Sequence, residues 1–257
     1  MTKTLQSLLT FAIDTAVSAG KITVEHFLTD IQSSTKGDGT PVTEVDQKTE
    51  AFIRRRIEKK YPGHEIVGEE YGIASKNKAR YRWFIDPIDG TNYYVRGVPL
   101  YSTLIGLEID GTIDVGVVYL PATGDLLAAA TGLGCWWNGK PVRVSNIDRL
   151  EKGIVAYSDI ANFYKQNSQA AFERVIKSSH YRVGWSDAYG YLMVATGRAD
   201  VMIEAAVSVW DVAPYAVIFR EAGGFFGDWK GTENIYSPQV MATNQFLLGQ
   251  VVNLLTG

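Results

Sequence analysis

The stretch WFIDPIDGTNYYVRGVP, residues 83–99, constrains the fold most, because it ends an apolar run with two acids. Trp83, Phe84 and Ile85 have the hydrophobicity and β propensity of a buried strand, and Asp86 and Asp89 follow directly. Burying a carboxylate is costly unless it is paired or binds a cation. The chain must therefore bring this strand end to an opening or to a compensating charge.

The remaining segments alternate between helical and β patterns and predict an α/β protein. Apolar spacing predicts helices over about residues 4–29 and 43–60, and two β-rich runs flank the turn signal Asp110-Gly111. Asn138-Gly139 is a second turn signal. Further strands are expected at about residues 153–158 and 200–205, and helices at about 163–178, 187–197 and 211–224. The pattern changes near residue 148, so we expect halves 1–147 and 148–257 that form one catalytic unit.

Composition excludes several classes of function. The net charge is -3 and Lys and Arg are scattered, which argues against a nucleic-acid partner. One cysteine, Cys135, fits a reducing compartment, so a cytoplasmic location is expected, and few histidines argue against a zinc site. Asp14 interrupts the N-terminal apolar pattern, and we expect no apolar run that approaches the ~18 residues of a membrane span. We therefore expect no membrane partner.

Six acids lie at the expected ends of helices and strands, and each has a structural alternative. Asp46 could complete a capping box with Thr43. Asp211 could stabilise a helix N-terminus, and Glu69-Glu70 could form a solvated turn. The full set is Asp46, Glu69, Glu70, Asp86, Asp89 and Asp211.

The segment Asp86-Pro87-Ile88-Asp89-Gly90-Thr91 is harder to explain structurally. Proline restricts one φ angle and glycine permits a tight turn, so both carboxylates and the Ile88 carbonyl can converge. Oxygen ligands of this kind suit a hard cation. The Thr91 hydroxyl could orient a water, and carboxylate-rich pairs of metals about 3.5–4 Å apart recur in phosphatases.

Three motifs in this order, GEE (68–70), WFIDPIDGT (83–91) and WDVAPYAVIFREAGG (210–224), resemble the Mg²⁺-dependent, lithium-sensitive inositol monophosphatase family over nearly the whole chain. The resemblance implies a layered αβαβα sandwich with the site between its halves. It also implies two or three Mg²⁺ ions per site, a small phosphorylated metabolite as substrate and a homodimer.

The resemblance also implies roles for individual residues. Asp46 and Thr91 would position and deprotonate a water, and Glu70 would hold further water. Gly90 and Thr91 would bind phosphate through backbone N–H groups, and Lys36 would lie in the family's mobile loop. The implied metal ligands are Glu69, Asp86, the Ile88 carbonyl, Asp89 and Asp211.

The tract WSDAYGY (185–191) resembles the GDAYGY tract of the histidinol-phosphate phosphatases, a branch of this superfamily. Ser186, Asp187, Glu204 and Asp211 are accordingly expected to bind substrate. Acids at 187 and 204 would attract the ammonium of histidinol phosphate, although Asp187 could instead cap a helix. An inositol-1-monophosphatase or broad sugar-alcohol phosphatase is the alternative, and a non-catalytic regulatory protein of the same fold is a distant one.

Overall fold

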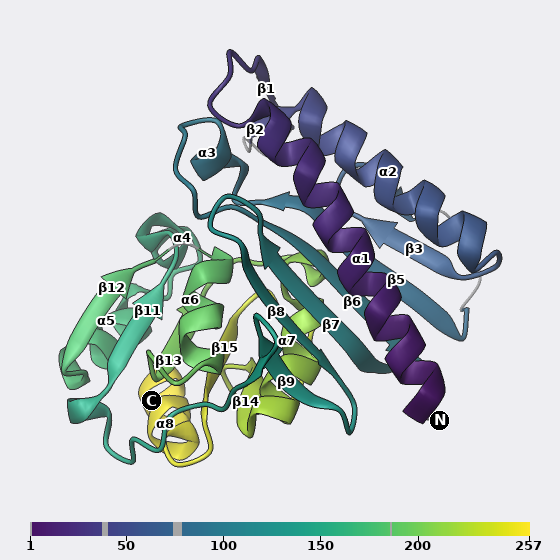
Figure 1. Cartoon of the computed structure of the whole chain (residues 1–257). Coiled ribbons are helices and arrows are strands. Elements are labelled where there is room, and N and C mark those ends of the chain that lie inside the picture. The colour runs from purple at the N-terminus through teal and green to yellow at the C-terminus, as the bar shows by residue number, and fades with distance from the viewer. Residues whose placement is uncertain (1, 38–40, 74–78, 186) are drawn as a thin grey trace.

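Two helices and a large sheet form the first layers of the computed structural model, which describes residues 2–37, 41–73, 79–185 and 187–257. Helices α1 (Thr2–His26) and α2 (Glu44–Lys60) cross one face of an eight-stranded sheet (Figure 1). Leu9 and Ile53 of these helices share a buried cluster with Trp83 and Ile105 of the sheet. This one-sided burial explains the helical spacing of the apolar residues.

The large sheet has the strand order β10-β9-β8-β7-β6-β5-β3-β4. Strands β3 and β5 are parallel, with Gly68 paired to Ile85, and the other neighbouring strands are antiparallel. The chain therefore leaves β3 at Glu69 beside the start of the DPID segment. The strands are β3 (Glu65–Gly68), β4 (Gly72–Ile73), β5 (Tyr81–Asp89), β6 (Ser102–Ile109), β7 (Thr112–Leu120), β8 (Asp125–Ala130), β9 (Gly134–Trp137) and β10 (Lys140–Pro141).

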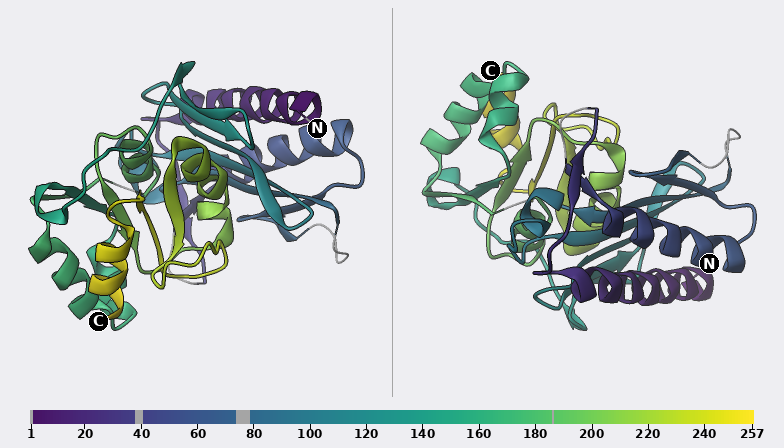
Figure 2. Two further views of the ribbon diagram at one scale, coloured as in Figure 1. Left: turned by 90° about the horizontal axis from the view of Figure 1, so that it is seen from below. Right: turned by 90° about the horizontal axis from the view of Figure 1, so that it is seen from above.

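Helices α6 (Asp187–Ala195) and α7 (Val209–Ala222) form the middle layer, between the large sheet and a five-stranded sheet (Figure 2). Helices α4 (Ile160–Lys165), α5 (Gln169–Ser178) and α8 (Leu248–Thr256) cover the outer face of the smaller sheet. The expected αβαβα sandwich is confirmed. The smaller sheet has the order β12 (Tyr181–Gly184), β11 (Ile154–Tyr157), β13 (Val201–Glu204), β15 (Val240–Asn244) and β14 (Gly224–Asp228).

Short elements complete the described chain. Strands β1 (Ser33–Thr35) and β2 (Pro41–Thr43) pair with each other, α3 (Thr91–Tyr94) is a single turn, and η1 (Leu150–Lys152) is a 3₁₀ turn. Both predicted hairpin turns are confirmed, because Asp110, Gly111, Asn138 and Gly139 all have positive φ angles.

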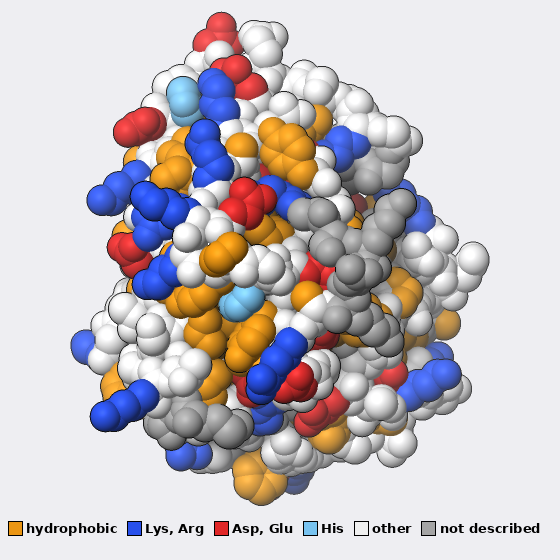
Figure 3. Space-filling view, turned by 90° about the vertical axis from the view of Figure 1, so that its right-hand side faces the viewer, with side chains coloured by type: hydrophobic (Ala, Val, Ile, Leu, Met, Phe, Trp, Pro, Cys, Tyr) orange, Lys and Arg blue, Asp and Glu red, His pale blue; other side chains and the backbone are white. Residues whose placement is uncertain are grey.

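On the face shown in Figure 3, basic and acidic side chains are interspersed.

Two predicted helix bounds were wrong. Residues 163–178 form the end of α4 and the whole of α5, and Asn167 between them has a φ of 53°. That left-handed conformation cannot continue a right-handed helix. Similarly, α1 ends at His26, and Leu28 has a φ of 63°.

Helix α7 approaches the large sheet closely where two strands lack side chains. Gly106 of β6 and Gly116 of β7 are cross-strand partners. A Cβ atom at Gly116 would lie 2.4 Å from the Pro214 carbonyl oxygen of α7, and one at Gly106 would lie 3.0 Å from the Ala213 Cβ. The paired glycines thus set the depth at which α7 sits, and with it the position of Asp211.

The expectation that no apolar run approaches the length of a membrane span was wrong for helix α1. Residues Lys3–His26 are long and apolar enough, by length and composition alone, to cross a membrane. Half of the most apolar window is buried inside the protein, against α2 and the large sheet. The apolar residues of α1 therefore have a role in the core of this fold.

Candidate active site

A cleft of about 610 Å³ collects most of the residues singled out in the sequence. It is lined by the end of β5, the start of α6 and α7, and the end of β13. Among the described residues that line it, seven are acidic and two, Arg96 and Lys165, are basic. The acids are Glu69, Asp86, Asp89, Asp159, Asp187, Glu204 and Asp211. Of the predicted residues, Ser186 lies outside the described part of the chain.

An irregularity in β5 brings Asp86 and Asp89 to the same cleft. Residues three apart in a regular strand point to opposite faces of the sheet. Strand β5 continues beyond the predicted end, but its pairing with β6 shifts between Asp86, opposite Leu104, and Asp89, opposite Ser102. Such a bulge redirects side chains. The Ser102 hydroxyl then donates to Asp89 Oδ2 at 3.0 Å, and the Ile88 N–H donates to Asp86 Oδ1 at 3.0 Å.

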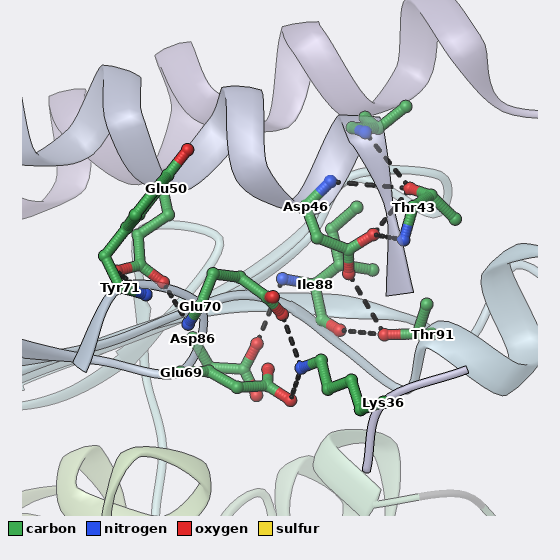
Figure 4. Close-up of polar contacts among 11 residues, drawn as sticks. Lys36, Thr43, Asp46, Glu50, Glu69, Glu70, Tyr71, Asp86, Ile88 and Thr91 are labelled. Atoms are coloured by element: carbon green, nitrogen blue, oxygen red, sulfur yellow. Dashed lines mark hydrogen bonds and ion pairs between the residues drawn. The ribbon is translucent and has the colours of Figure 1, made fainter. Parts of the chain in front are cut away.

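Asp46 combines a capping role with a contact to the DPIDGT segment. It completes the predicted capping box, because the Thr43 backbone N–H donates to Asp46 Oδ2 at 2.9 Å. Its other oxygen accepts a hydrogen bond of 3.1 Å from the Thr91 hydroxyl (Figure 4). Gly90, which precedes Thr91, has a φ of 83°, as the predicted tight turn requires. The structural and the functional interpretation of Asp46 are thus compatible.

Lys36 occupies the space between the two acids that follow β3. Its ammonium donates to Glu69 Oε1 at 2.7 Å and to Glu70 Oε1 at 2.6 Å (Figure 4). Partial burial lowers the pKa of Lys36, but the bonds and charges of the two glutamates outweigh it and raise the pKa overall. Burial raises the pKa of Glu70 to about 7, the bond from Lys36 opposes this, and the charge of Glu69 adds to it.

Glu50, which the sequence analysis did not identify, supports this loop from α2. Its buried carboxylate accepts hydrogen bonds from the Glu70 N–H at 2.7 Å and the Tyr71 N–H at 3.2 Å (Figure 4). It also accepts one from Arg54 Nε at 2.7 Å. A Cβ atom at Gly68 would lie 2.2 Å from Glu50 Oε1. The glycine of the GEE motif is therefore required by the approach of a carboxylate.

The C-terminal half contributes two neighbouring acids to the cleft, the half-buried Asp187 and the buried Glu204. Each acts on the pKa of the other, and burial is the largest cause that raises both pKa values. Ser158 donates to Glu204 Oε1 at 2.7 Å, and Tyr191 donates to Glu204 Oε2 at 2.6 Å. Burial, and then the charge of Asp187, raise the pKa of Glu204 well above its usual value.

Asp211 lies at the start of α7, but the helix begins two residues earlier than predicted. Ser208 is the N-cap, and its N–H donates to Asp211 Oδ2 at 2.8 Å in a capping box. Burial raises the pKa of Asp211 to about 7, although the bond from Ser208 opposes the shift. Asp86 and Asp211 act on each other's pKa, so acids from both halves of the chain lie together in the cleft.

The donor set of the cleft fits a hard cation. Every candidate ligand atom is an oxygen, which suits Mg²⁺ or Ca²⁺ rather than a softer metal. Burial and then neighbouring negative charges raise the pKa values of Asp86 and Asp89 well above normal, so bound cations would relieve an unfavourable cluster. In the described residues, no three His, Cys, Asp or Glu side chains already surround one point as a metal would require. The acids line one cleft without closing on a common centre.

Several cleft residues were missed by the sequence analysis. Ser158 follows directly after β11, so its position at a strand end was a usable signal. Tyr215 lies four residues after Asp211 and therefore on the same helix face. The sequence offered no comparable signal for Ser102, Arg96 or Lys165, since only the fold brings them to the cleft.

The comparisons with known proteins agree with this architecture and acid cluster. The chain belongs to the inositol monophosphatase family, a family of phosphatases, whose model matches residues 4–254. The class expected from the three motifs is therefore confirmed.

Individual relatives differ in their described substrates. A histidinol-phosphatase of Chlorobaculum parvum is 36% identical, covering 94% of this chain and 93% of its own. Inositol monophosphatase 3 of Solanum lycopersicum is 35% identical, covering 95% and 94%. The solved inositol monophosphatase from Anabaena superposes with a TM-score of 0.86 at 28% identity, covering 98% of this chain and 96% of its own. The family thus includes relatives that are described by different substrates.

Proposed function

We propose that this protein hydrolyses a phosphate monoester in a Mg²⁺-dependent reaction and that its substrate is L-histidinol phosphate. The Mg²⁺-dependent hydrolysis is supported by the cluster of acids in one cleft, in a chain that belongs to a phosphatase family. Three of these acids, Asp86, Asp89 and Glu204, are buried. A phosphate dianion cannot approach seven acidic side chains unless cations balance their charge. We therefore propose that hydrolysis requires bound metal.

The residues that would hold Mg²⁺ are Glu69, Asp86, Asp89, Asp211 and the Ile88 carbonyl. When bound, Mg²⁺ would stabilise the negative charge of the phosphoryl group and make a water molecule more acidic. Ser102 orients Asp89, and Glu50 holds the backbone of Glu70, so both would position the acids that they contact.

Asp46 and Thr91 would prepare the attacking water. The Thr91 hydroxyl lies 3.1 Å from both Asp46 Oδ1 and the Ile88 carbonyl oxygen. With Ile88 engaged by metal, the hydroxyl would donate to Asp46 and leave its oxygen free to accept from a water in the cleft. A water held by Thr91 could pass its proton to Asp46 through this hydrogen bond. Asp46 suits this role because burial raises its pKa, while bonds from Thr43 and Thr91 oppose the shift. Gly90 and Thr91 would bind the phosphate through their N–H groups, and Glu70 would hold further water.

The Asp187–Glu204 pair supports the choice of substrate. In the described residues, no hydrogen bond or ion pair joins either acid to a basic side chain. An arriving ammonium would balance the negative charge of the pair and would be bound by charge-assisted hydrogen bonds. Histidinol phosphate carries an ammonium beside its phosphate ester, whereas inositol phosphate offers only hydroxyls. The similarity to histidinol-phosphatases over nearly the whole chain points the same way.

The test compares phosphate release from L-histidinol phosphate and inositol 1-phosphate, each with Mg²⁺ and with EDTA. We expect Mg²⁺-dependent release with a clear preference for histidinol phosphate. In Asp187→Asn, the preference should fall by about 10-fold or more, because one charged acceptor is lost. A preference of the wild-type enzyme for inositol 1-phosphate would retain the hydrolase and reject this substrate. Release from neither ester would reject both parts.

The homodimer and the cytoplasmic location of this protein are also proposals. Homodimer formation is testable by light scattering during gel filtration, and a cytoplasmic location by cell fractionation. A monomeric elution or a membrane-bound fraction would contradict these expectations.

A further inference from the structure

Tyr215 is a buried tyrosine on the wall of the cleft. It lies on α7, one turn after Asp211, and its side chain is 1% exposed. Its hydroxyl has no hydrogen-bond partner among the residues that the structure describes. Buried polar groups are nearly always paired, because an unpaired one has lost its water without compensation. The orphaned hydroxyl therefore requires an explanation.

Neighbouring rings prevent this hydroxyl from turning toward solvent. The Tyr215 ring stacks on Tyr191, with ring centroids 4.1 Å apart and an interplanar angle of 20°. Phe219 and Phe226 pack around the same ring, at centroid distances of 6.4 and 6.1 Å. Tyr215 lines the cleft, and the charges that act most on its hydroxyl are those of Asp89, Glu204, Asp187 and Asp211.

Tyr191 provides an internal comparison. It is equally buried and belongs to the same stack, but its hydroxyl donates to Glu204 Oε2 at 2.6 Å. One tyrosine of the stack thus bonds to a cleft acid, and the hydroxyl of the other is buried without a partner among the described residues. A purely structural aromatic at position 215 would not need a hydroxyl, since phenylalanine would stack equally well.

We infer that the Tyr215 hydroxyl positions the substrate by accepting a hydrogen bond from its ammonium group, together with Asp187 and Glu204. An ammonium has three N–H donors, and these three side chains supply an acceptor each. The inference rests on the proposed function, because it assumes an ammonium-bearing phosphate ester. It adds a specificity-determining residue that the motifs did not indicate.

The test compares the wild-type enzyme with Tyr215→Phe on L-histidinol phosphate and on p-nitrophenyl phosphate, which carries no ammonium. We expect the selectivity, the ratio of the two kcat/KM values, to fall by about 10-fold, mainly through KM for histidinol phosphate. L-histidinol, titrated by calorimetry with Mg²⁺ and inorganic phosphate present, should bind about 10-fold more weakly to the variant.

Thermal unfolding provides the control for a structural effect. Tyr215→Phe removes a hydroxyl without a partner, so its melting temperature should equal or exceed that of the wild type. Tyr191→Phe breaks a buried bond to Glu204 and should lower it. Unchanged selectivity and unchanged L-histidinol binding in Tyr215→Phe would overturn the inference while leaving the proposed function standing. If the wild-type enzyme does not prefer histidinol phosphate, the result contradicts both the proposed substrate and the inference on Tyr215. Phosphate release by the wild-type enzyme alone measures this outcome.

Discussion

The Thr91 hydroxyl donates a hydrogen bond of 3.1 Å to the Asp46 carboxylate, across 45 residues of sequence. The same Asp46 accepts from the N-cap residue Thr43, so a helix cap and a cleft residue share one carboxylate. The start of α2 therefore holds the side chain that would accept the proton of the attacking water.

Thr91→Ala should lower kcat by about 100-fold or more, because it removes the hydroxyl between water and base. Thr91→Ser retains the hydroxyl and is the matched control, for which we expect a much smaller loss. Steady-state phosphate release with saturating Mg²⁺ measures both. Equal kcat values for Thr91→Ala and the wild type would remove Thr91 from the mechanism.

Removal of divalent metal by EDTA should abolish phosphate release, and added Mg²⁺ should restore it. Asp89→Asn should lower activity by at least about 100-fold. Changes to residues that only support metal ligands cost 10–100-fold, and Asp89 is itself a proposed ligand. Ser102→Ala, which removes the hydrogen bond to Asp89, should weaken Mg²⁺ binding by about 10-fold while retaining measurable turnover. Full activity of Asp89→Asn would show that the metal site is elsewhere.

Lys36→Gln should bind Mg²⁺ about 3- to 10-fold more tightly, because the ammonium no longer competes for Glu69 and Glu70. The metal-free variant should also melt at a lower temperature than the metal-free wild type, since two neighbouring acids lose their shared cation. Calorimetric titration and thermal unfolding measure the two effects. Weaker Mg²⁺ binding in the variant would mean that Lys36 assists the metal rather than competing with it.

The metal-free protein should lose stability as the pH rises from about 4.5 to above 7. Burial raises the pKa values of Glu70 and Asp211 to about 7, so the folded state binds protons that the unfolded chain has already released. Deprotonation then favours unfolding across this window. Melting temperatures measured in EDTA at about pH 5.5 and pH 8 should show the decline, and saturating Mg²⁺ should reduce it. A metal-free protein that gains stability with pH would contradict the raised pKa values.

Gly68→Ala should lower the free energy of unfolding by about 2–4 kcal/mol, because its Cβ would meet the buried Glu50 carboxylate. It should also reduce Mg²⁺ affinity, since Glu69 and Glu70 follow directly on the displaced backbone. Gly249→Ala is the control, because nothing lies within 4 Å of its Cβ position, and alanine favours the helix. Urea unfolding measures both variants, and equal stabilities would refute the proposed approach of Glu50.

The sequence predicted the class of fold and most of the acids because these depend on local signals. Hydrophobic period identified α1 and α2, and the Asp-Gly and Asn-Gly pairs identified both hairpin turns. The helix expected over 163–178 was divided, because no local signal was strong enough to show that Asn167 adopts a positive φ.

The cleft itself could be predicted only in part. The roles of Asp46 and Asp211 as capping residues follow from local spacing, but their convergence with Asp86 does not. Ser102 and Glu50 contact cleft acids or the loop that carries them, although neither lies in the three motifs. Their contribution follows from strand pairing and helix packing.

The sequence by itself determined the elements, the order of the acids and the family, because periodicity, turn residues and motifs are properties of neighbouring residues. Only the tertiary structure decided which groups meet. The bulge in β5 turns Asp86 and Asp89 to one cleft, and the glycine pair under α7 sets how close Asp211 comes. The hydroxyl of Tyr215 is orphaned for the same reason: its partners are determined by packing between layers, which no local pattern encodes.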